Sequence, residues 1–246
     1  MNNVEIDELH FSNRKTISLI IDGKGRLIVR APNKTPKKFI QELINEKEIW
    51  ITKKKREVIR KQEEVPTISF NEGEKFLYRG NNCTLKYENN LTPPILLKNN
   101  HIIIDKRYEK YAPQLLEKWY KIEAYNYFNR KAKHYANSMK VQFNKVKISN
   151  AQKRWGSCSS KKNINLSWRL IMAPDAAIDY VIVHELAHLI EMNHSQKFWN
   201  IVAHAMPSYK KHLNWINKNG HLLTIYKEGE KPVVSPSFQE GAGGVV

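Results

Sequence analysis

The chain has 246 residues, of which 41 are Lys or Arg and 24 are Asp or Glu, so its formal net charge is +17. This length suits one large domain or two small ones, and the contents of 41% apolar and 10% aromatic residues exclude a chain that is disordered throughout. Only two cysteines are present, Cys83 and Cys158, which excludes a disulfide framework.

The sequence lacks the patterns of secretion and of membrane insertion. The first eight residues, MNNVEIDE, are acidic and do not have the basic-then-apolar order of a secretory signal. No stretch approaches the ~18–20 continuous apolar residues that span a bilayer. Together with the low cysteine content, these features predict a cytoplasmic protein with no membrane partner.

The positive charge is concentrated in two blocks. Residues 24–61 contain 13 basic and 4 acidic residues, including the run Lys53-Lys54-Lys55-Arg56, and residues 140–170 contain 8 basic residues and no acidic ones. One interpretation is a solvated surface that aids solubility. The other is a contact with an anionic substrate or with nucleic acid.

The first part of the chain has a strand-rich pattern. Residues 14–31 alternate apolar and polar side chains around Asp22-Gly23-Lys24-Gly25, which predicts a β-hairpin. A basic helix is expected from Pro36 to about Glu64, followed by short strands at 67–70, 75–78, 83–87 and 101–105. We therefore expect a β-rich N-terminal module with one basic helix over residues 1–105.

The second part is dominated by helices. A long amphipathic helix is expected over 113–139, and three short strands follow near 146–149, 155–158 and 164–168. A strongly apolar helix then runs from Asp175 to about Met192, and helices over 195–206 and 208–219 each begin at a Ser that can cap them. This pattern predicts an α+β fold, with a helical module over 106–227 and a disordered tail over 228–246.

The apolar helix contains the one string that indicates specific chemistry, His184-Glu185-Leu186-Ala187-His188. Two histidines at positions i and i+4 lie on one helix face, so both imidazoles can bind one zinc ion. Glu185 lies on the flank of that face, where its carboxylate can act as a general base without being a ligand. Buried His and Glu side chains are costly unless they are paired or bound to metal.

A catalytic zinc ion requires a third protein ligand and one open position. His194 is favoured because Asn193 can adopt the left-handed conformation that ends a helix, which would bring the chain back over the site. Glu191 lies ~10.5 Å along the axis from His184, too far for one ion to contact both. His204 would require the next helix to pack across the site.

Four motifs in this order resemble the YgjP-like metallopeptidase family, which is related to the SprT-like and WLM zinc proteases. They are Arg154-Trp155-Gly156-Ser157-Cys158-Ser159-Ser160, Asn165-Leu166-Ser167-Trp168-Arg169-Leu170, His184-Glu185-Leu186-Ala187-His188, and Asn193-His194-Ser195 with Phe198-Trp199. The resemblance covers most of the chain, to about Trp215. It implies a zincin-like catalytic domain over 106–227 in which a long helix, a small antiparallel sheet and an active-site helix hold one Zn²⁺ at His184, His188 and His194, with Glu185 as base.

The first of these motifs is the expected substrate-binding segment. Gly156 allows close backbone approach by a ligand or another element, and Ser157 lies beside it. In zincin-type folds an edge strand next to the metal helix pairs with a peptide substrate. Arg154 and Arg169 either bind an oxyanion or a substrate anion, or form salt bridges. Cys158 is expected to be a small buried residue, although a metal contact or a redox-sensitive thiol is the alternative.

The sequence therefore predicts a zinc-dependent hydrolase, with a metallopeptidase that cleaves peptide or protein substrates as the leading hypothesis. One alternative is a metal-dependent hydrolase of nucleotides or phosphoanhydrides, motivated by the acid-free segment before the motif. Another is a protease recruited to DNA or RNA by the basic N-terminal module.

Overall fold

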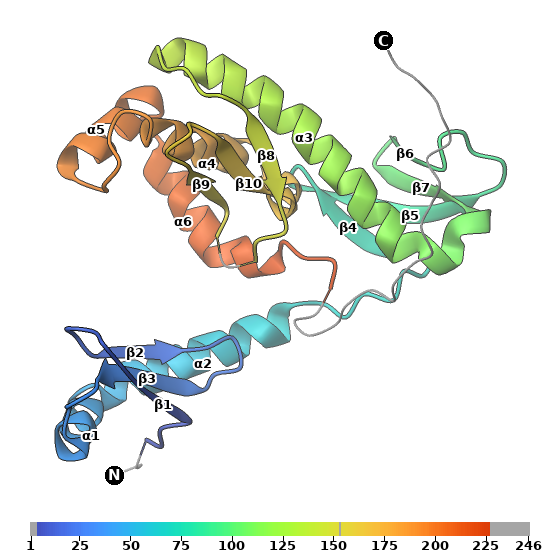
Figure 1. Cartoon of the computed structure of the whole chain (residues 1–246). Helices are drawn as coiled ribbons and strands as arrows, with labels where there is room; N and C mark the ends of the chain where they lie inside the picture. Colours follow the sequence, from blue (N-terminus) through green and yellow to red (C-terminus); the bar gives the residue numbers. More distant parts are fainter. Residues whose placement is uncertain (1–3, 153, 227–246) are drawn as a thin grey trace. The chain divides into compact units, whose positions relative to one another are not determined.

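Figure 1 shows the computed structural model of the chain, which describes residues 4–152 and 154–226. The chain divides into two compact units, Met1–Pro66 and Thr67–Val246. The described residues form helices and three small sheets, so the predicted α+β class is confirmed. The expected disordered tail lies outside the described residues. No helix within the described ranges is long and apolar enough to cross a membrane.

The first unit contains a three-stranded sheet. The predicted hairpin is formed by β2 (Ser18–Ile21) and β3 (Leu27–Pro32), which pair antiparallel. The turn between them is fixed by Asp22, whose Oδ1 accepts the backbone N–H groups of Lys24 and Arg26 at 2.9 Å each, and by Gly25 at φ +76°. A further strand, β1 (Glu8–Ser12), which was not expected, pairs parallel with β3.

Two helices follow the sheet where one was expected. α1 (Lys37–Glu46) and α2 (Glu48–Glu64) are separated at Lys47, whose ψ of 8° departs from helical geometry. Ile40, Ile44 and Ile51 are buried with the inner residues of β3 and form the core of this unit. In the basic run, Lys54 pairs with Glu57 at 2.8 Å and Lys55 with Asp7 at 3.4 Å, so part of its charge is neutralised.

The second unit begins with a four-stranded sheet, ordered β4-β5-β7-β6. Its strands are β4 (Lys75–Tyr78), β5 (Asn81–Glu88), β6 (Ile95–Lys98) and β7 (His101–Asp105). β6 was not expected, and the strand expected at 67–70 is absent. There Phe70 has φ +59° and the backbone N–H of Ser69 bonds to the Glu74 carboxylate instead of to a neighbouring strand.

This sheet shares a hydrophobic core with the long helix α3 (Ala112–Met139), which follows the short helix η1 (Lys106–Tyr111). Phe76, Leu85 and Ile102 are buried together with Leu116, and the Tyr120 hydroxyl donates to the Leu77 carbonyl at 2.7 Å. The boundary between the two compact units therefore follows Pro66 in the sequence, whereas the expected module boundary followed residue 105. The reason is that strands 75–105 bury their inner face on α3.

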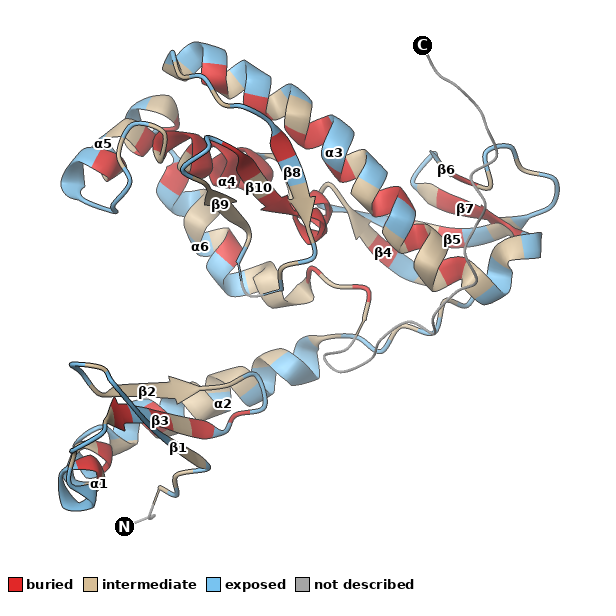
Figure 2. Ribbon diagram, viewed as in Figure 1, coloured by how far each residue is buried: buried red, intermediate tan, exposed pale blue. Residues whose placement is uncertain are grey.

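The third sheet has the order β8-β10-β9 and lies beside α3 (Figure 1). β8 (Val146–Ser149) is parallel to β10 (Ile164–Ser167), and β9 (Gly156–Cys158) is antiparallel to β10 and forms an edge. The sheet is therefore mixed and not antiparallel as expected, because the chain crosses from β8 to the edge before it returns along β10. The sheet leads through η2 (Trp168–Met172) into α4 (Asp175–Ala187). Figure 2 shows η2 and α4 as an almost continuous buried segment.

The chain ends in α5 (Gln196–Ala205), α6 (Tyr209–Asn219) and η3 (Gly220–Leu222). The Ser195 hydroxyl caps α5 by accepting the backbone N–H of Phe198, as predicted, whereas Ser208 makes no such bond at α6. The expected helix from Asp175 to Met192 was too long, because α4 ends at Ala187 and the chain leaves it in a tight turn with Leu189 bonded to Leu186.

The position of the unit boundary can be tested with fragments. Fully burying one large apolar side chain contributes about 1.5–3 kcal/mol, and total stability is about 5–15 kcal/mol. A fragment of residues 106–246 loses the buried strand residues Phe76, Leu85, Ile102 and Ile104, whereas a fragment of residues 67–246 keeps them. We expect cooperative thermal unfolding by circular dichroism for the longer fragment and none for the shorter one. Equal cooperative transitions would contradict this division.

Candidate metal centre

Three histidines from three different local structures come together in the second unit. His184 lies in α4, His188 is its C-cap residue, and His194 lies in the loop before α5. One possible ligand atom from each lies within 4.8 Å of the others, and the Nε2 atoms of His184 and His194 are 3.1 Å apart. Zinc–nitrogen bonds of about 2.0–2.1 Å in a tetrahedron place ligand nitrogens about 3.3–3.4 Å apart. The cluster therefore has the donor set and the spacing of a metal site.

Two further contacts orient the histidines of α4. The backbone carbonyl of Glu191 lies 3.1 Å from Nδ1 of His188, and the Tyr180 hydroxyl lies at a longer 3.5 Å from Nδ1 of His184. Ligating histidines usually make such contacts through the nitrogen that does not face the metal. These contacts leave Nε2 of His184 and His188 free for the site.

Burial favours the neutral, metal-binding form of His184 and His188. It lowers the pKa of His184 to about 4, with smaller contributions from His188 and His194. Burial also lowers the pKa of His188. Because metal ions bind neutral imidazole, fewer protons compete with the metal at neutral pH.

Aromatic rings from α5 and α6 surround the three imidazoles. Phe198 is fully buried, and its ring centroid lies 4.6 to 4.9 Å from those of all three histidines. Five further ring contacts, with centroids 5.0 to 6.4 Å apart, form a closed circuit that connects the loop before α5 to α4, α5 and α6. The members of this aromatic circuit, in order, are His184, Tyr180, Tyr209, Trp199 and His194. This circuit holds His194, the one histidine without helical support.

Glu185 is a buried carboxyl group beside this cluster. Its side chain is almost fully buried, and its Oε2 has no hydrogen-bond partner among the described residues. Burial raises the pKa of Glu185 to about 7, while Arg154 and the backbone N–H of Cys158 act in the opposite direction. A carboxyl group with a pKa near neutrality can both accept and release a proton.

Gly156 is required by the position of Glu185. A Cβ atom at residue 156 would lie 2.5 Å from Oε1 of Glu185 and 2.6 Å from its Cγ. No side chain fits there without moving the carboxylate. The predicted close approach at Gly156 thus involves Glu185 itself, which packs directly against the edge strand β9.

The other residues of the expected substrate segment have different surroundings. Ser157 lies on the opposite face of β9 and contacts the Asn165 amide, at 3.3 Å through its hydroxyl. Arg154 is exposed and acts electrostatically on Glu185. Arg169 is buried, stacks 4.5 Å from the centre of the Trp168 ring and donates to the Asn150 carbonyl at 3.2 Å. Neither of these two partners belongs to the histidine cluster.

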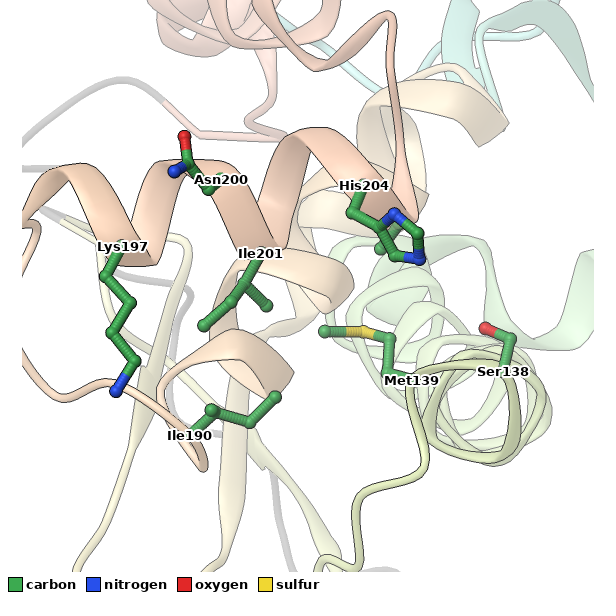
Figure 3. A pocket seen from close by; sticks show the side chains of 8 residues that line it. Ser138, Met139, Ile190, Lys197, Asn200, Ile201 and His204 are labelled. Carbon is green, nitrogen blue, oxygen red and sulfur yellow. The ribbon is translucent and has the colours of Figure 1, made fainter.

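The two alternatives to His194 lie outside the cluster. The Glu191 carboxylate pairs with Lys197 at 3.6 Å. His204 lines a groove of about 580 Å³ between α3, α5 and the loop after α4 (Figure 3). Asn193 does not adopt the expected left-handed conformation. Instead its side-chain oxygen accepts the backbone N–H of Ser195 at 2.9 Å and so shapes the ligand loop.

Two site residues were missed in the sequence, Tyr180 and Tyr209. Tyr180 lies one helical turn before His184, so the i, i+4 spacing could have indicated it. Tyr209 had no local signal, because only the packing of α6 against α4 brings it to the site.

Comparison with known protein families places the chain in the class of metallopeptidase domains. The matching family is YgjP-like, metallopeptidase domain, and the match spans residues 15–219, so the chain belongs to the YgjP-like family. The resemblance found in the sequence is thereby confirmed.

Among solved structures, the chain is similar to two crystal structures of metallopeptidase zymogens. Abylysin from Pyrococcus abyssi is 22% identical, with a TM-score of 0.35, and the match covers 37% of this chain and 93% of abylysin. Jannalysin from Methanocaldococcus jannaschii is 21% identical, with a TM-score of 0.33, and the match covers 37% of this chain and 95% of jannalysin. A comparison with curated proteins gives no match.

The aromatic circuit predicts a measurable effect on metal affinity. Trp199→Ala removes the ring that stacks on His194, and loss of a group that orients a ligand typically weakens metal binding by about 10- to 100-fold. Trp199→Phe should retain most of the affinity, and Trp50→Ala in the first unit serves as the control. Zinc dissociation constants from chelator competition give the measurement. Equal affinity for Trp199→Ala and the wild type would show that the circuit does not position His194.

Proposed function

We propose that this protein is a zinc-dependent metallopeptidase with a zincin-like site, in which His184, His188 and His194 hold the ion and Glu185 is the general base. The observation that supports it best is the cluster of three imidazoles beside a buried carboxyl group, Glu185, which follows His184 in α4. Three neutral imidazoles suit zinc, and a three-ligand site leaves a position open for water or substrate.

Glu185 has the properties that the reaction requires of a base. A bound zinc ion supplies an acidified water and polarises the carbonyl of the scissile bond. Oε2 of Glu185, which has no other partner in the described structure, accepts the proton of the attacking water. The same oxygen then delivers that proton to the nitrogen of the leaving amine.

Strand β9 is the proposed substrate platform. It is the edge of its sheet, and Glu185 packs against Gly156 in that strand. An extended peptide that pairs with β9 by β-addition would bring its backbone to the catalytic carboxylate. This arrangement supports a peptide or protein substrate.

The two alternative hypotheses are weaker. Phosphoanhydride hydrolysis remains favoured only by the acid-free segment at 140–170. Recruitment to nucleic acid rested on the basic run Lys53–Arg56, in which Lys54 and Lys55 are already paired with acidic side chains.

Substitution of Glu185 should separate metal binding from catalysis. Glu185→Gln should retain zinc, because Glu185 is not a ligand, and turnover of a peptide mixture should fall by about 10²- to 10⁴-fold, because an amide cannot accept the proton. His184→Ala or His188→Ala should instead lose the metal. Elemental analysis and peptide hydrolysis measure the two effects, with nucleoside triphosphates as the competing substrates. Full activity of Glu185→Gln would place the base elsewhere, and full zinc in either histidine variant would refute the site.

Gly156→Ala tests the contact between β9 and the base. The new Cβ forces the Glu185 carboxylate to move, and a misplacement of about 1 Å can cost roughly 10²-fold in rate. We expect kcat to fall by about that factor while zinc content and thermal stability stay close to the wild type. Ser157→Ala, which changes the other face of the same strand, is the matched control. A Gly156→Ala protein with unchanged kcat would rule out this contact as a catalytic constraint.

A further inference from the structure

The acid-free segment at 140–170 forms a surface of unpaired cations around the third sheet. It contains six described Lys and Arg residues that are exposed, and none of them forms a salt bridge, whereas other cations of this unit, such as Arg79, Lys121 and Lys131, do. The six are Lys140, Lys145, Lys147, Arg154, Lys161 and Lys162. Charges that lack partners within the chain are available to a ligand.

The strand register shows where part of this charge lies. Lys147, Asn165 and Ser157 are direct neighbours across β8, β10 and β9, so they share one face of the sheet. The opposite face carries Val146 and Ile164, which are buried in the core. The face of Lys147 is therefore the solvent side.

Two further lysines lie at one end of the edge strand. β9 runs from Gly156 to Cys158 and then enters the turn of residues 159–162, which is closed by the bond from the Lys162 N–H to the Ser159 carbonyl at 2.8 Å. Lys161 and Lys162 in this turn are exposed. The positive charge thus lies beyond the Cys158 end of β9.

The hydrogen bonds of β9 define what its free edge can bind. The Trp155 carbonyl accepts the N–H of Ser167 in β10, and the Ser159 N–H donates to Asn163 just before β10, so the alternating pattern also turns Ser157 toward β10 and turns Gly156 and Cys158 away from it. The Cys158 N–H bonds to the Glu185 carboxylate, which leaves the Gly156 N–H and the carbonyls of Gly156 and Cys158 on the open side. These groups include carbonyl acceptors as well as an N–H donor. An extended peptide backbone matches both, whereas a fully ionised phosphate offers acceptors alone and leaves the carbonyls of the strand without donors.

The direction of an added strand then follows. A peptide that pairs antiparallel with β9 has its N-terminal side next to Cys158 and the 159–162 turn, and its C-terminal side next to Gly156. At about 3.4 Å per residue, the substrate residues two to four positions before the one opposite Cys158 lie level with the turn. There they meet Lys161 and Lys162.

We propose that this surface selects peptide substrates that carry acidic side chains a few residues N-terminal to the cleaved bond. The inference rests on the proposed peptidase function and adds its substrate class. The acidic side chains contact the lysines of the 159–162 turn while the backbone pairs with β9.

The test uses the full-length, zinc-loaded protein and a peptide library of mixed sequence, with cleavage sites read by mass spectrometry. The best peptide is then compared with a version in which its upstream acidic residues are replaced by Asn and Gln. The variant is Lys161→Gln with Lys162→Asn, since Asn tolerates the φ of +56° at residue 162. The matched control, Lys86→Gln with Lys98→Gln, removes two exposed lysines from the other sheet of the same unit.

We expect Asp and Glu to be enriched a few residues N-terminal to the cleaved bond. For the best peptide, kcat/KM should exceed that of its neutral version by about three- to tenfold at low salt and by less at high salt. The Lys161/Lys162 variant should lose this preference and keep its rate on the neutral peptide, and the control should behave like the wild type.

Other results would overturn the inference. Equal cleavage of acidic and neutral peptides, or a preference that survives in the Lys161/Lys162 variant, leaves the peptidase intact but removes this specificity. Enrichment on the C-terminal side would reverse the strand direction and refute the assignment. If no peptide is cleaved while nucleoside triphosphates are hydrolysed, and the variant slows that hydrolysis, both the peptidase function and the peptide specificity fail.

Discussion

The burial of α4 is the constraint on which the rest of the structure depends. This helix is covered by α3, by the third sheet and by the C-terminal helices, so nearly all its side chains lie in the core. Polar groups in such a helix are costly unless they meet partners. His184 meets two other imidazoles, whereas Glu185 keeps an oxygen with no partner among the described residues. An unsatisfied buried carboxyl group beside three clustered imidazoles is what a metal site with an adjacent base requires.

The site is assembled from elements that differ in stiffness. His184 is held by a buried helix, but His194 lies in a loop and is exposed. The Phe198 ring contacts all three imidazoles, and Trp199, on which Tyr209 stacks, itself stacks on His194. Because α5 and α6 supply these rings, they support the loop residue His194 and do not only cover the core.

The three sheets share one topology. In each, two consecutive strands form a hairpin, and the strand that precedes them in the sequence pairs parallel with the second strand of that hairpin. The three sets, in spatial order, are β1-β3-β2, β5-β7-β6 and β8-β10-β9. Helical structure follows each of them. In the third sheet, the small edge residue Gly156 lets the edge strand contact Glu185 of α4. Among the described residues, the cluster of three histidines occurs beside this sheet alone.

Local sequence determined the elements that have a clear hydrophobic periodicity or a clear turn signal. The hairpin at 14–31, the helix α3 and the i, i+4 pair of histidines were all predicted, because Gly turns, helical periodicity and ligand spacing are local properties. Short elements such as β1 and β6 were missed, and α4 was predicted too long, because their limits depend on pairing and turn bonds that local propensity does not fix.

Tertiary structure alone decided the unit boundary, the groups that surround Glu185 and the rings that contact His194. Strands 75–105 joined the second unit because their apolar face is complementary to α3, a contact between distant segments. Gly156 meets Glu185, and Tyr209 meets Trp199, only after the sheet and α6 have packed on α4 and α5. The sequence by itself thus determined which residues can hold a metal ion, and the fold decided which groups surround them. The reason is that ligand chemistry belongs to the side chain, whereas burial and close approach depend on packing between distant segments.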